Sequence, residues 1–202
     1  MERLVPEEKA FRVSAVLLAA GAGRRFGDGG KLLAPHGAGR LIDGALRLAL
    51  AAPVAEVVLV TGARGQDVAD HAAALTRDPR LRVVEAADWA DGLSASLRAG
   101  IGAVAGADAA LVLLGDMPRV PVAVLAPLLA AVRGGAPAAA PVFRGLRGHP
   151  VAFSAALFPQ LLALTGDQGA GRLLAGLGEG LTLVEAPDDG VLYDVDTPGD
   201  LR

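Results

Sequence analysis

The sequence predicts an α/β fold in which helices cover both faces of a mostly parallel sheet. Short apolar runs alternate with segments of helical periodicity, the order expected when parallel strands are joined through helices. Hydrophobic residues make up 52% of the 202-residue chain and are mainly Ala, Leu and Val, whereas aromatics contribute only 3%. This composition favours Val- and Leu-rich strands beneath Ala- and Leu-rich helices over a β-sandwich, and the length suffices for one domain with a full core.

The first half of the chain is expected to alternate strands and helices. A buried-strand run comes first and leads into a Gly- and Arg-rich loop, and the next segment repeats Leu41, Ala45, Leu48 and Ala49 at helical spacing. Strand-like and helical stretches then follow in turn. The expected strands are Val13–Ala19, Glu56–Thr61 and Leu81–Glu85, and the expected helices are Leu41–Ala52, Gln66–Leu75 and Ser94–Val104.

The second half opens with a fully apolar strand, Ala109–Leu114. A helix over Val122–Val132 accepts Pro121 in its first turn, where no backbone N–H is required. The remaining expected elements are strand-like pieces around Ala138–Phe143 and Pro150–Phe153 and a helix near Ala155–Leu164, before Leu181–Glu185 and Asp194–Pro198 complete the chain. Ligands of such sheets bind outside the carboxyl ends of the strands, so we expect the site at the loops after Ala19 and Leu114.

Charge and composition exclude several function classes. A net charge of −3 and a pI near 5.6 argue against nucleic-acid binding, because no broad basic surface is available. The chain has no Cys, which excludes disulfides, zinc–thiolate sites and a Cys nucleophile and favours a reducing compartment. The run Val13–Ala20 is too short to span a bilayer and lacks the flanks of a signal peptide, so a cytoplasmic protein without membrane attachment is expected.

A glycine-rich loop follows the first strand: Leu18-Ala19-Ala20-Gly21-Ala22-Gly23, then Arg25 and Lys31. Glycines let backbone amides approach phosphates, and the two basic side chains add charge where a triphosphate would lie. The spacing fits neither a dinucleotide fingerprint nor a Walker A loop. A glycine-rich turn with solvated arginines is the alternative. The choice of residue at position 31 argues against this alternative. Because 17 of the 19 basic residues are Arg and Lys31 is the only Lys outside the N-terminal tail, a lysine at this position indicates a specific role.

Two acidic motifs stand at the ends of strand-like runs. In Gly115-Asp116-Met117-Pro118, a carboxylate directly after a buried strand is held rigidly, as Mg²⁺ requires. In Asp194-Val195-Asp196-Thr197-Pro198, alternation puts both carboxylates on one side of an extended segment. The alternatives are an ordinary turn or helix cap at Asp116 and a helix N-cap before Pro198. The functional interpretation is one magnesium site shared by Asp116 and Asp196.

Two further segments carry candidate binding residues. Ser94 and Ser96 stand at an expected helix start, where hydroxyls and free amides either read a base or ribose or simply cap the helix. In Gly145-Leu146-Arg147-Gly148-His149-Pro150, His149 faces an acceptor in one interpretation and is structural in the other. The sequence has neither a Ser–His–Asp spacing nor a Cys/His cluster, so nothing in it indicates covalent catalysis.

Together these segments resemble the molybdenum cofactor nucleotidyltransferases, most closely the cytidylyltransferases, over about residues 13–202. The loop after the first strand is shared with many sugar and isoprenoid nucleotidyltransferases. Matches at Asp91–Gly100, Arg147–Val151 and Thr165–Ala170 are more specific, and Gly115–Pro118 and Asp194–Pro198 match as well. Gly199 departs from the pattern, because an acidic residue is usual after Thr-Pro.

The resemblance implies a Rossmann-like three-layer sandwich of the nucleotide-diphospho-sugar transferase type. It implies reaction of CTP with molybdenum-bound molybdopterin to give the cytosine dinucleotide cofactor and pyrophosphate. By matching position, Asp116 and Asp196 would hold Mg²⁺ and Arg25 and Lys31 would take the triphosphate, so Arg25, Lys31 and Asp116 are the expected catalytic residues. Transient contact with a molybdoenzyme chaperone or apo-enzyme belongs to the same expectation.

The expected site divides between two halves of one domain. Residues 1–11 are expected to be a flexible tail before a single domain, residues 12–202, with a seam near Gly134-Gly135 between a nucleotide-binding half (about 12–133) and an acceptor-binding half (about 134–202). The expected nucleotide-binding residues are Leu18, Ala19, Ala20, Gly21, Ala22, Gly23, Arg25, Lys31, Thr61, Gly62, Ser94 and Asp116. The expected acceptor-binding residues are Met117, Pro118, Arg147, Gly148, His149 and Asp167.

The base preference is expected to depend on Ala20. Resembling enzymes that use GTP tend to carry Leu-Ala-Gly-Gly where this chain has Leu18-Ala19-Ala20-Gly21, so a methyl at Ala20 would narrow the pocket against a purine. The alternatives are transfer from GTP, or transfer to another phosphorylated acceptor such as a sugar phosphate. A non-catalytic nucleotide-sensing module is a third, and an oxidoreductase is disfavoured by the failed dinucleotide fingerprint.

Overall fold

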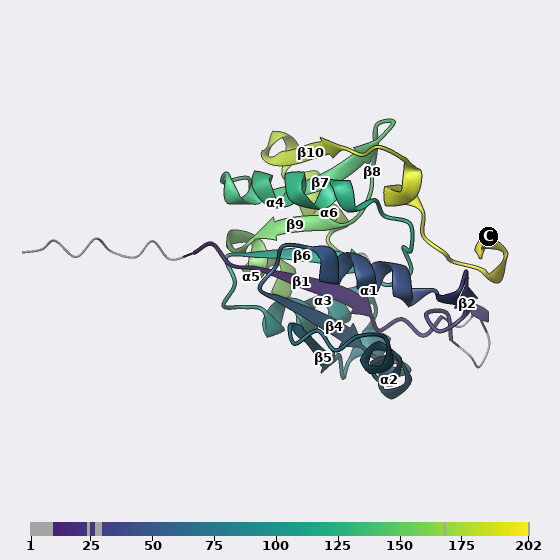
Figure 1. Cartoon of the computed structure of the whole chain (residues 1–202). Helices are drawn as coiled ribbons and strands as arrows, with labels where there is room; N and C mark the ends of the chain where they lie inside the picture. Colours follow the sequence, from purple (N-terminus) through teal and green to yellow (C-terminus); the bar gives the residue numbers. More distant parts are fainter. Residues whose placement is uncertain (1–9, 24, 27–29, 168, 202) are drawn as a thin grey trace, which may run out of the picture.

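The computed structural model describes residues 10–23, 25–26, 30–167 and 169–201, and a mixed sheet of eight strands runs through this part of the chain (Figure 1). Seven of these strands lie in the order β10-β7-β9-β6-β1-β4-β5, and β8 pairs with β7. The strands are β1 Val13–Ala19, β4 Glu56–Thr61, β5 Leu81–Glu85, β6 Ala109–Leu114, β7 Ala138–Phe143, β8 Leu146–Arg147, β9 Val151–Ser154 and β10 Leu181–Glu185. Strand β9 is antiparallel to β6 and β7, whereas β1 is parallel to β4 and β6.

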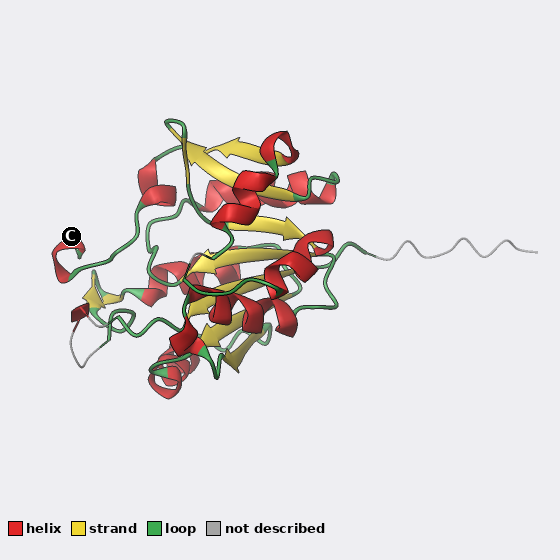
Figure 2. Cartoon of the chain, turned by 180° about the vertical axis from the view of Figure 1, so that it is seen from behind, coloured by secondary structure: helices red, strands yellow, loops and turns green. Residues whose placement is uncertain are grey.

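Helices cover both faces of the sheet (Figures 1 and 2). Helices α1, α2 and α4 pack into one hydrophobic cluster and α3, α5 and α6 into another, so the layers are helix, sheet, helix. Their bounds are α1 Ile42–Ala51, α2 Gly65–Leu75, α3 Leu93–Ala103, α4 Leu125–Arg133, α5 Phe158–Leu162 and α6 Gly171–Gly176. The predicted α/β class with a mostly parallel central sheet is confirmed.

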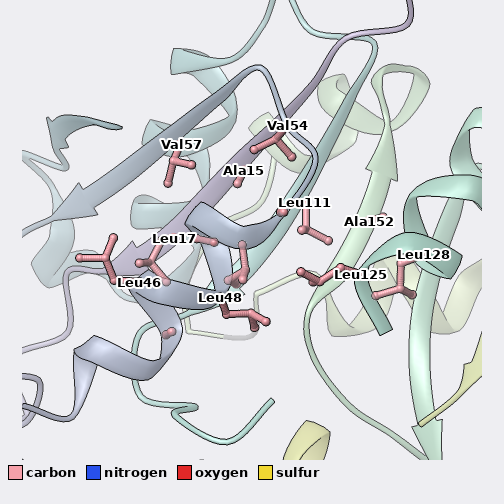
Figure 3. Close-up of a cluster of buried hydrophobic side chains, with 14 of the residues drawn as sticks. Ala15, Leu17, Leu46, Leu48, Val54, Val57, Leu111, Leu125, Leu128 and Ala152 are labelled. Atoms are coloured by element: carbon pink, nitrogen blue, oxygen red, sulfur yellow. The ribbon is translucent and has the colours of Figure 1, made fainter. Parts of the chain in front are cut away.

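Alternate residues of β1 point into the two clusters. Ala15 and Leu17 belong to the cluster beneath α1 and α4, part of which is shown in Figure 3, whereas Val16 and Leu18 belong to the cluster beneath α3. Every residue of β1 is buried, as expected for a strand covered on both faces. Because burying one Leu side chain contributes about 1.5–3 kcal/mol, these contacts hold the register of β1 firmly and thereby place the loop that leaves it.

Two predicted helices begin with a 3₁₀ turn, and proline explains both. An α-helix beginning at Val122 would need a backbone N–H from Pro127, and one beginning at Ala155 would need a backbone N–H from Pro159. Proline has no such N–H. The turns are therefore the 3₁₀ helices η3 Val122–Val124 and η4 Ala155–Leu157, and α4 and α5 follow them.

The structure also contains short elements outside the predicted strands and helices. A small hairpin, β2 Pro35–His36 and β3 Gly39–Arg40, follows the glycine-rich loop, and short 3₁₀ turns punctuate the chain. These further 3₁₀ turns are η2 Trp89–Asp91, η5 Gly178–Gly180, η6 Asp189–Leu192 and η7 Pro198–Asp200. In the predicted tail, residues 1–9 lie outside the described residues, but Phe11 packs against the core beneath the Arg133 guanidinium. Among the described helices, none has the length and apolar character needed to cross a membrane.

The order of the strands reverses at β1. The chain adds β4 and β5 on one side of β1 and then returns to place β6 on its other side. In open α/β sheets a crevice for ligands forms at the carboxyl ends of the two strands that flank such a switch point. The C-terminal segment after β10 crosses this edge of the sheet and ends near β2 (Figure 1).

Candidate active site

A cavity of about 680 Å³ lies at the carboxyl ends of β1 and β6. Its wall includes the glycine-rich loop after β1, the segment around Trp89 that precedes α3, and the end of β6. Asp167 and Asp196 add carboxylates from the C-terminal half. The cavity therefore occupies the switch point at which the sequence predicted a ligand site.

Glycine allows the loop after β1 to fold closely over its own end. Gly23 has a φ of +56°, and a Cβ at this position would lie 2.4 Å from the Lys31 Cβ and 2.7 Å from its backbone nitrogen. A side chain at Gly23 would therefore both strain the backbone and displace Lys31. At Gly21, by contrast, a Cβ would meet no atom of the described residues within 4 Å, so among these residues the backbone is open to an approaching phosphate.

Lys31 joins two carboxylates that are distant in sequence. Its Nζ donates to Asp116 Oδ2 at 2.6 Å and to Asp196 Oδ1 at 3.1 Å. The Lys31 side chain is only 12% exposed, compared with 26% for Asp116 and 60% for Asp196. Arg25 lies farther out, with its Nη1 at 4.0 Å from Asp196 Oδ2 and 69% of its side chain exposed. The cluster thus has a largely buried lysine at its centre and a solvated arginine at its rim.

Backbone contacts hold the two carboxylates in place. The Gly115 N–H donates to the Leu18 carbonyl at 2.9 Å, which ties the end of β6 to the end of β1. The Val195 N–H donates to the Asp116 carbonyl at 3.1 Å, so the C-terminal segment lies directly beside the turn after β6. Since β6 is buried up to this point, Asp116 is presented by a rigid element.

A capping box fixes the backbone around Asp196. Asp200 Oδ2 accepts from the Thr197 N–H at 2.7 Å, the Thr197 Oγ1 at 2.8 Å and the Asp196 N–H at 3.2 Å. These contacts define the start of η7 as a capped helical turn. Asp200 therefore supplies the acidic cap one residue after Gly199, and the departure from the family pattern at Gly199 leaves the cap intact.

The carboxylates stabilise the charge of Lys31. Burial alone would lower the pKa of Lys31, but the attraction of Asp116 and hydrogen bonds to Asp116 and Asp196 outweigh it and raise the pKa above the ordinary 10.5. Lys31 is therefore an ammonium ion throughout the physiological range. It places a permanent positive charge at the mouth of the glycine-rich loop.

The oxygens of Asp116 and Asp196 suit a magnesium ion. Both carboxylates reach the same nitrogen, so a single cation could contact both. No group of three or more His, Asp or Glu side chains that could hold a metal occurs among the described residues. Two carboxylates are nevertheless a common protein contribution to a Mg²⁺ site, because substrate phosphates and water complete its octahedron.

Comparison with known proteins identifies the family. Residues 15–182 match the MobA-like NTP transferase domain. The chain belongs to this family. The MobA-like chain is 35% identical over 193 residues to the nicotine blue oxidoreductase of Paenarthrobacter nicotinovorans, covering 92% of each protein. It is 34% identical over 192 residues to the purine catabolism protein PucB of Bacillus subtilis, covering 91% of each.

Solved structures agree with the family assignment. Rv0371c from Mycobacterium tuberculosis H37Rv superposes with a TM-score of 0.81 at 27% identity, covering 96% of both chains. The same protein in complex with manganese gives a TM-score of 0.74 at 25% identity, covering 94% of this chain and 95% of that one. A nucleotidyl transferase from Methanothermobacter thermautotroptrophicus gives 0.76 at 31% identity, covering 94% of both chains. The predicted fold type and the resemblance to MobA-like nucleotidyltransferases are thus confirmed.

Most of the predicted nucleotide-binding residues lie around the cavity of this MobA-like domain. Those that line it are Leu18, Ala19, Ala20, Gly21, Ala22, Gly23, Arg25, Lys31 and Asp116. Thr61 and Gly62 lie behind this wall: Thr61 is buried, and a Cβ at Gly62 would be 2.7 Å from the Cβ atoms of both Ala20 and Trp89. The structure therefore places this pair as support for the wall.

Ser94 is also placed away from the cavity. Its side chain is fully buried, and its hydroxyl donates to the Gly166 carbonyl at 2.5 Å. Ser96 lines the cavity instead. Residues two apart on a helix point in nearly opposite directions, so only one of the two serines can face the cavity. Sequence spacing could have shown that the two serines differ, but not which one faces the ligand.

The predicted acceptor-binding residues fall into three groups. Asp167 lines the main cavity, whereas Arg147, Gly148 and His149 line an adjoining cavity of about 200 Å³. Leu18, Leu93 and Leu114 line both cavities. Met117 is buried in the core, and Pro118 packs closely against Gly44 of α1, so the structure does not bring these two to either cavity.

His149 is held as a neutral imidazole. Burial lowers its pKa to about 4, with Asp116 opposing the shift and Arg147 adding to it. Its Nδ1 is a buried atom without a hydrogen-bond partner among the described residues. In an unfolded chain the same imidazole would take up a proton near its ordinary pKa of 6.5. The unfolded state therefore binds more protons than the native state between these two values.

We expect the free energy of unfolding to fall as the pH drops from about 6.5 to about 4, because protons then favour the unfolded chain. The contribution of His149 between pH 7 and pH 5 is about 2 kcal/mol. Urea unfolding at both pH values should show that His149→Gln removes this part of the pH dependence, while His36→Gln retains it. Equal pH dependence in His149→Gln and the wild type would show that His149 is protonated normally in the folded protein.

Several cavity-lining residues were missed at the sequence level. Trp89, Ala90, Gly92 and Leu93 line the cavity from the segment that leads into α3. Gly92 has a φ of +109°, and a Cβ there would lie 2.1 Å from Asp167 Oδ1, so only glycine allows the two segments to meet. The sequence indicates Ser94 and Ser96 next to this wall, but its apolar residues carry no signal that distinguishes a cavity wall from a core.

Proposed function

We propose that this MobA-like domain transfers CMP from CTP to a molybdopterin-type acceptor, releasing pyrophosphate. The observation that carries the proposal is the cluster of Lys31, Asp116 and Asp196 at the mouth of a cavity bordered by a glycine-rich loop. The cluster combines an ammonium ion, two carboxylates that can bind a hard cation, and accessible backbone amides. Together these groups can bind a triphosphate and its metal ion. The acceptor assignment is supported by the sequence resemblance.

The chemistry requires charge neutralisation and alignment. An oxygen of the acceptor's terminal phosphate attacks the α-phosphorus in line, and the bond from that phosphorus to the bridging oxygen of pyrophosphate breaks. The attacking oxygen is already anionic at neutral pH, so no general base is needed. Lys31 and Arg25 neutralise charge on the departing pyrophosphate, and the amides around Gly21 orient the phosphates.

Asp116 and Asp196 would hold Mg²⁺ in this proposal. The ion would neutralise phosphate charge and help to align the reacting groups. The manganese complex of Rv0371c supports a divalent cation in a related protein. Because Lys31 already contacts both carboxylates, binding of the cation requires Lys31 to exchange at least one of these contacts for a phosphate.

The adjoining cavity is the candidate place for the body of the acceptor. Its walls are mainly apolar, with Phe153 and Leu174 on the sheet and helix sides and Arg147 among the polar residues. Such a pocket suits a flat heterocycle whose phosphate extends toward the main cavity. We further propose that the protein acts in the cytoplasm and hands its product to a molybdoenzyme chaperone or apo-enzyme.

We expect the wild type to prefer CTP over GTP and Ala20→Gly to relax this preference. Ala20 is buried against Gly62 and lines the cavity beside Trp89, so its methyl group limits the width of the base site. Excluding a larger ring in this way is worth about 1–3 kcal/mol, or roughly ten- to two-hundred-fold. Values of kcat/KM for both nucleotides with a molybdopterin acceptor measure the preference, with Ala22→Gly as the matched control in the same loop.

These measurements test the nucleotide, the acceptor and the type of reaction separately. Equal or better use of GTP by the wild type would overturn the CTP assignment and leave nucleotidyl transfer standing. A sugar phosphate used in preference to molybdopterin would overturn the acceptor. Binding of CTP without pyrophosphate release in the presence of any acceptor would instead identify a nucleotide-sensing module.

A second candidate function is oxidoreduction, because a relative of 35% identity is named nicotine blue oxidoreductase. The glycine-rich loop lacks the spacing of a dinucleotide fingerprint, and its charged cluster suits phosphates better than a hydride transfer. Absorbance at 340 nm during incubation with NADH or NADPH and a quinone-like dye tests this alternative. Steady dye-dependent oxidation at a rate above that of CMP transfer would establish it.

A further inference from the structure

Two walls of the main cavity come from segments far apart in the sequence. Trp89 and Ala90 form one wall just before α3, and Asp167 belongs to the other, in the loop after α5. In the proposed function the first wall would face the nucleotide and the second the acceptor. The two walls meet where Gly92 approaches Asp167, so their relative position decides whether both substrates are held in line.

The guanidinium of Arg98 on α3 contacts the segments that carry both walls. Its Nη2 donates to Asp88 Oδ2 at 2.6 Å, next to Trp89, and its Nη1 donates to the Leu164 carbonyl at 2.7 Å. The side chain of Arg98 is 26% exposed and that of Asp88 49%, so these contacts are partly shielded from water. A planar guanidinium can donate in two directions at once, which the point charge of a lysine does not reproduce.

Ser94, one turn earlier on α3, adds two contacts to the acceptor wall. Its Oγ donates to the Gly166 carbonyl at 2.5 Å, and its backbone N–H donates to the same oxygen at 3.2 Å. Arg98 Nη1 lies 3.5 Å from the Ser94 Oγ, which connects the two side chains. The start of α3 is thus joined by side chains to the loop that carries Asp167.

We propose that Arg98 and Ser94 form a clasp that fixes the relative position of the two cavity walls. Arg98 positions the Trp89 wall through Asp88 and the Asp167 loop through Leu164, while Ser94 positions that loop through Gly166. Both are positioning residues, since neither lines the main cavity. The proposed division into a nucleotide wall and an acceptor wall rests on the proposed function, whereas the clasp itself rests on the contacts.

Amide hydrogen exchange of the full-length protein tests the clasp without reference to activity. In Arg98→Met we expect exchange to become at least about five-fold faster in peptides from both Asp88–Leu93 and Leu164–Asp167. Ser94→Ala should affect mainly the second segment. The matched control is Arg82→Met, because Arg82 likewise joins a carboxylate, Glu56, to a carbonyl of α3, Ala103, but at the other end of the helix. It should leave both segments unchanged.

Equilibrium binding and kinetics then test the positioning role. Isothermal titration with CTP and Mg²⁺ in the absence of acceptor should show about ten-fold weaker binding for Arg98→Met and partial recovery in Arg98→Lys, which retains one contact. Ser94→Ala should keep the CTP affinity within about two-fold and raise the KM for the acceptor by about five- to ten-fold at an almost unchanged kcat. A residue that merely stabilises the fold would not separate the two substrates in this way.

The outcomes distinguish the clasp from the proposed function. If the exchange of both segments in Arg98→Met equals that of the wild type, the clasp is refuted, whatever the activity. If both segments loosen but the wild type neither binds CTP nor releases pyrophosphate, the clasp stands and the proposed function fails. If Arg82→Met loosens the same segments to the same extent, the effect is general destabilisation and the positioning role is refuted.

Discussion

Replacing Asp116 by Asn is expected to lower kcat for CMP transfer by about a hundred- to a thousand-fold. The substitution keeps the size and a hydrogen-bond acceptor for Lys31, but it removes the negative charge that a magnesium ion needs. Asp196 would then be the only charged partner of Lys31 in this pair of acidic positions. The free energy of unfolding should change by no more than about 1–2 kcal/mol, because the ion pair is partly exposed to water.

The measurement is initial-rate kinetics with CTP and acceptor over a wide range of Mg²⁺ concentrations. Asp194→Asn is the matched control, since Asp194 lies two residues before Asp196 in the same segment and is exposed outside the cavity lining. We expect it to keep near wild-type activity. If Asp116→Asn turns over at the wild-type rate at saturating Mg²⁺, Asp116 is not a metal ligand.

Replacing Lys31 by Ala is expected to lower kcat and kcat/KM together by about a hundred-fold or more. Charge moves onto the pyrophosphate as the bond to the α-phosphorus breaks, so an ammonium ion beside it acts more strongly on the transition state than on bound CTP. The raised pKa of Lys31 means that the wild type supplies this charge at any pH at which the protein is assayed. Removing it also leaves Asp116 and Asp196 without their shared partner.

Arg25 provides the comparison for Lys31. It is also basic and borders the same cavity, but its side chain is 69% exposed and lies 4.0 Å from Asp196. Arg25→Ala is therefore expected to cost about ten-fold or less, mainly through KM. A Lys31→Ala variant with a raised KM and an unchanged kcat would reduce Lys31 to a substrate-binding residue. Full activity would remove Lys31 from the site.

The architecture could be predicted because local patterns encode it. Short runs rich in apolar residues predicted β1, β4, β5, β6 and β7 with the bounds that the structure shows, and helical spacing predicted the helices between them to within a few residues. The carboxyl ends of parallel strands meet at one edge of the sheet, so Lys31 and Asp116 could be expected to meet although 85 residues separate them. Their catalytic and metal-binding roles are still predictions.

Other features of the fold and the site depend on contacts between distant segments and could not be predicted from the sequence. The hydroxyl of Ser94 donates a hydrogen bond to the carbonyl of Gly166, which lies 72 residues away. No local sequence pattern predicts such a partner. Met117 follows Asp116 directly, yet it points into the core because neighbouring residues of a turn face different sides. Strand β10 and helix α6 lie among glycine-rich segments without clear periodicity. Their positions depend on the pairing of β10 with β7 and on the packing of α6 against the core.

Following the phosphates of CTP tests the central claim most directly. The wild type is incubated with Mg²⁺, a molybdopterin acceptor and CTP labelled at either the α- or the γ-phosphate, and the products are separated and identified by mass. We predict that the α-label appears in the acceptor product and the γ-label appears only in pyrophosphate, and that Asp116→Asn forms both products about a hundred- to a thousand-fold more slowly. The γ-label on the acceptor, or its release as inorganic phosphate with no α-label transferred, would contradict nucleotidyl transfer.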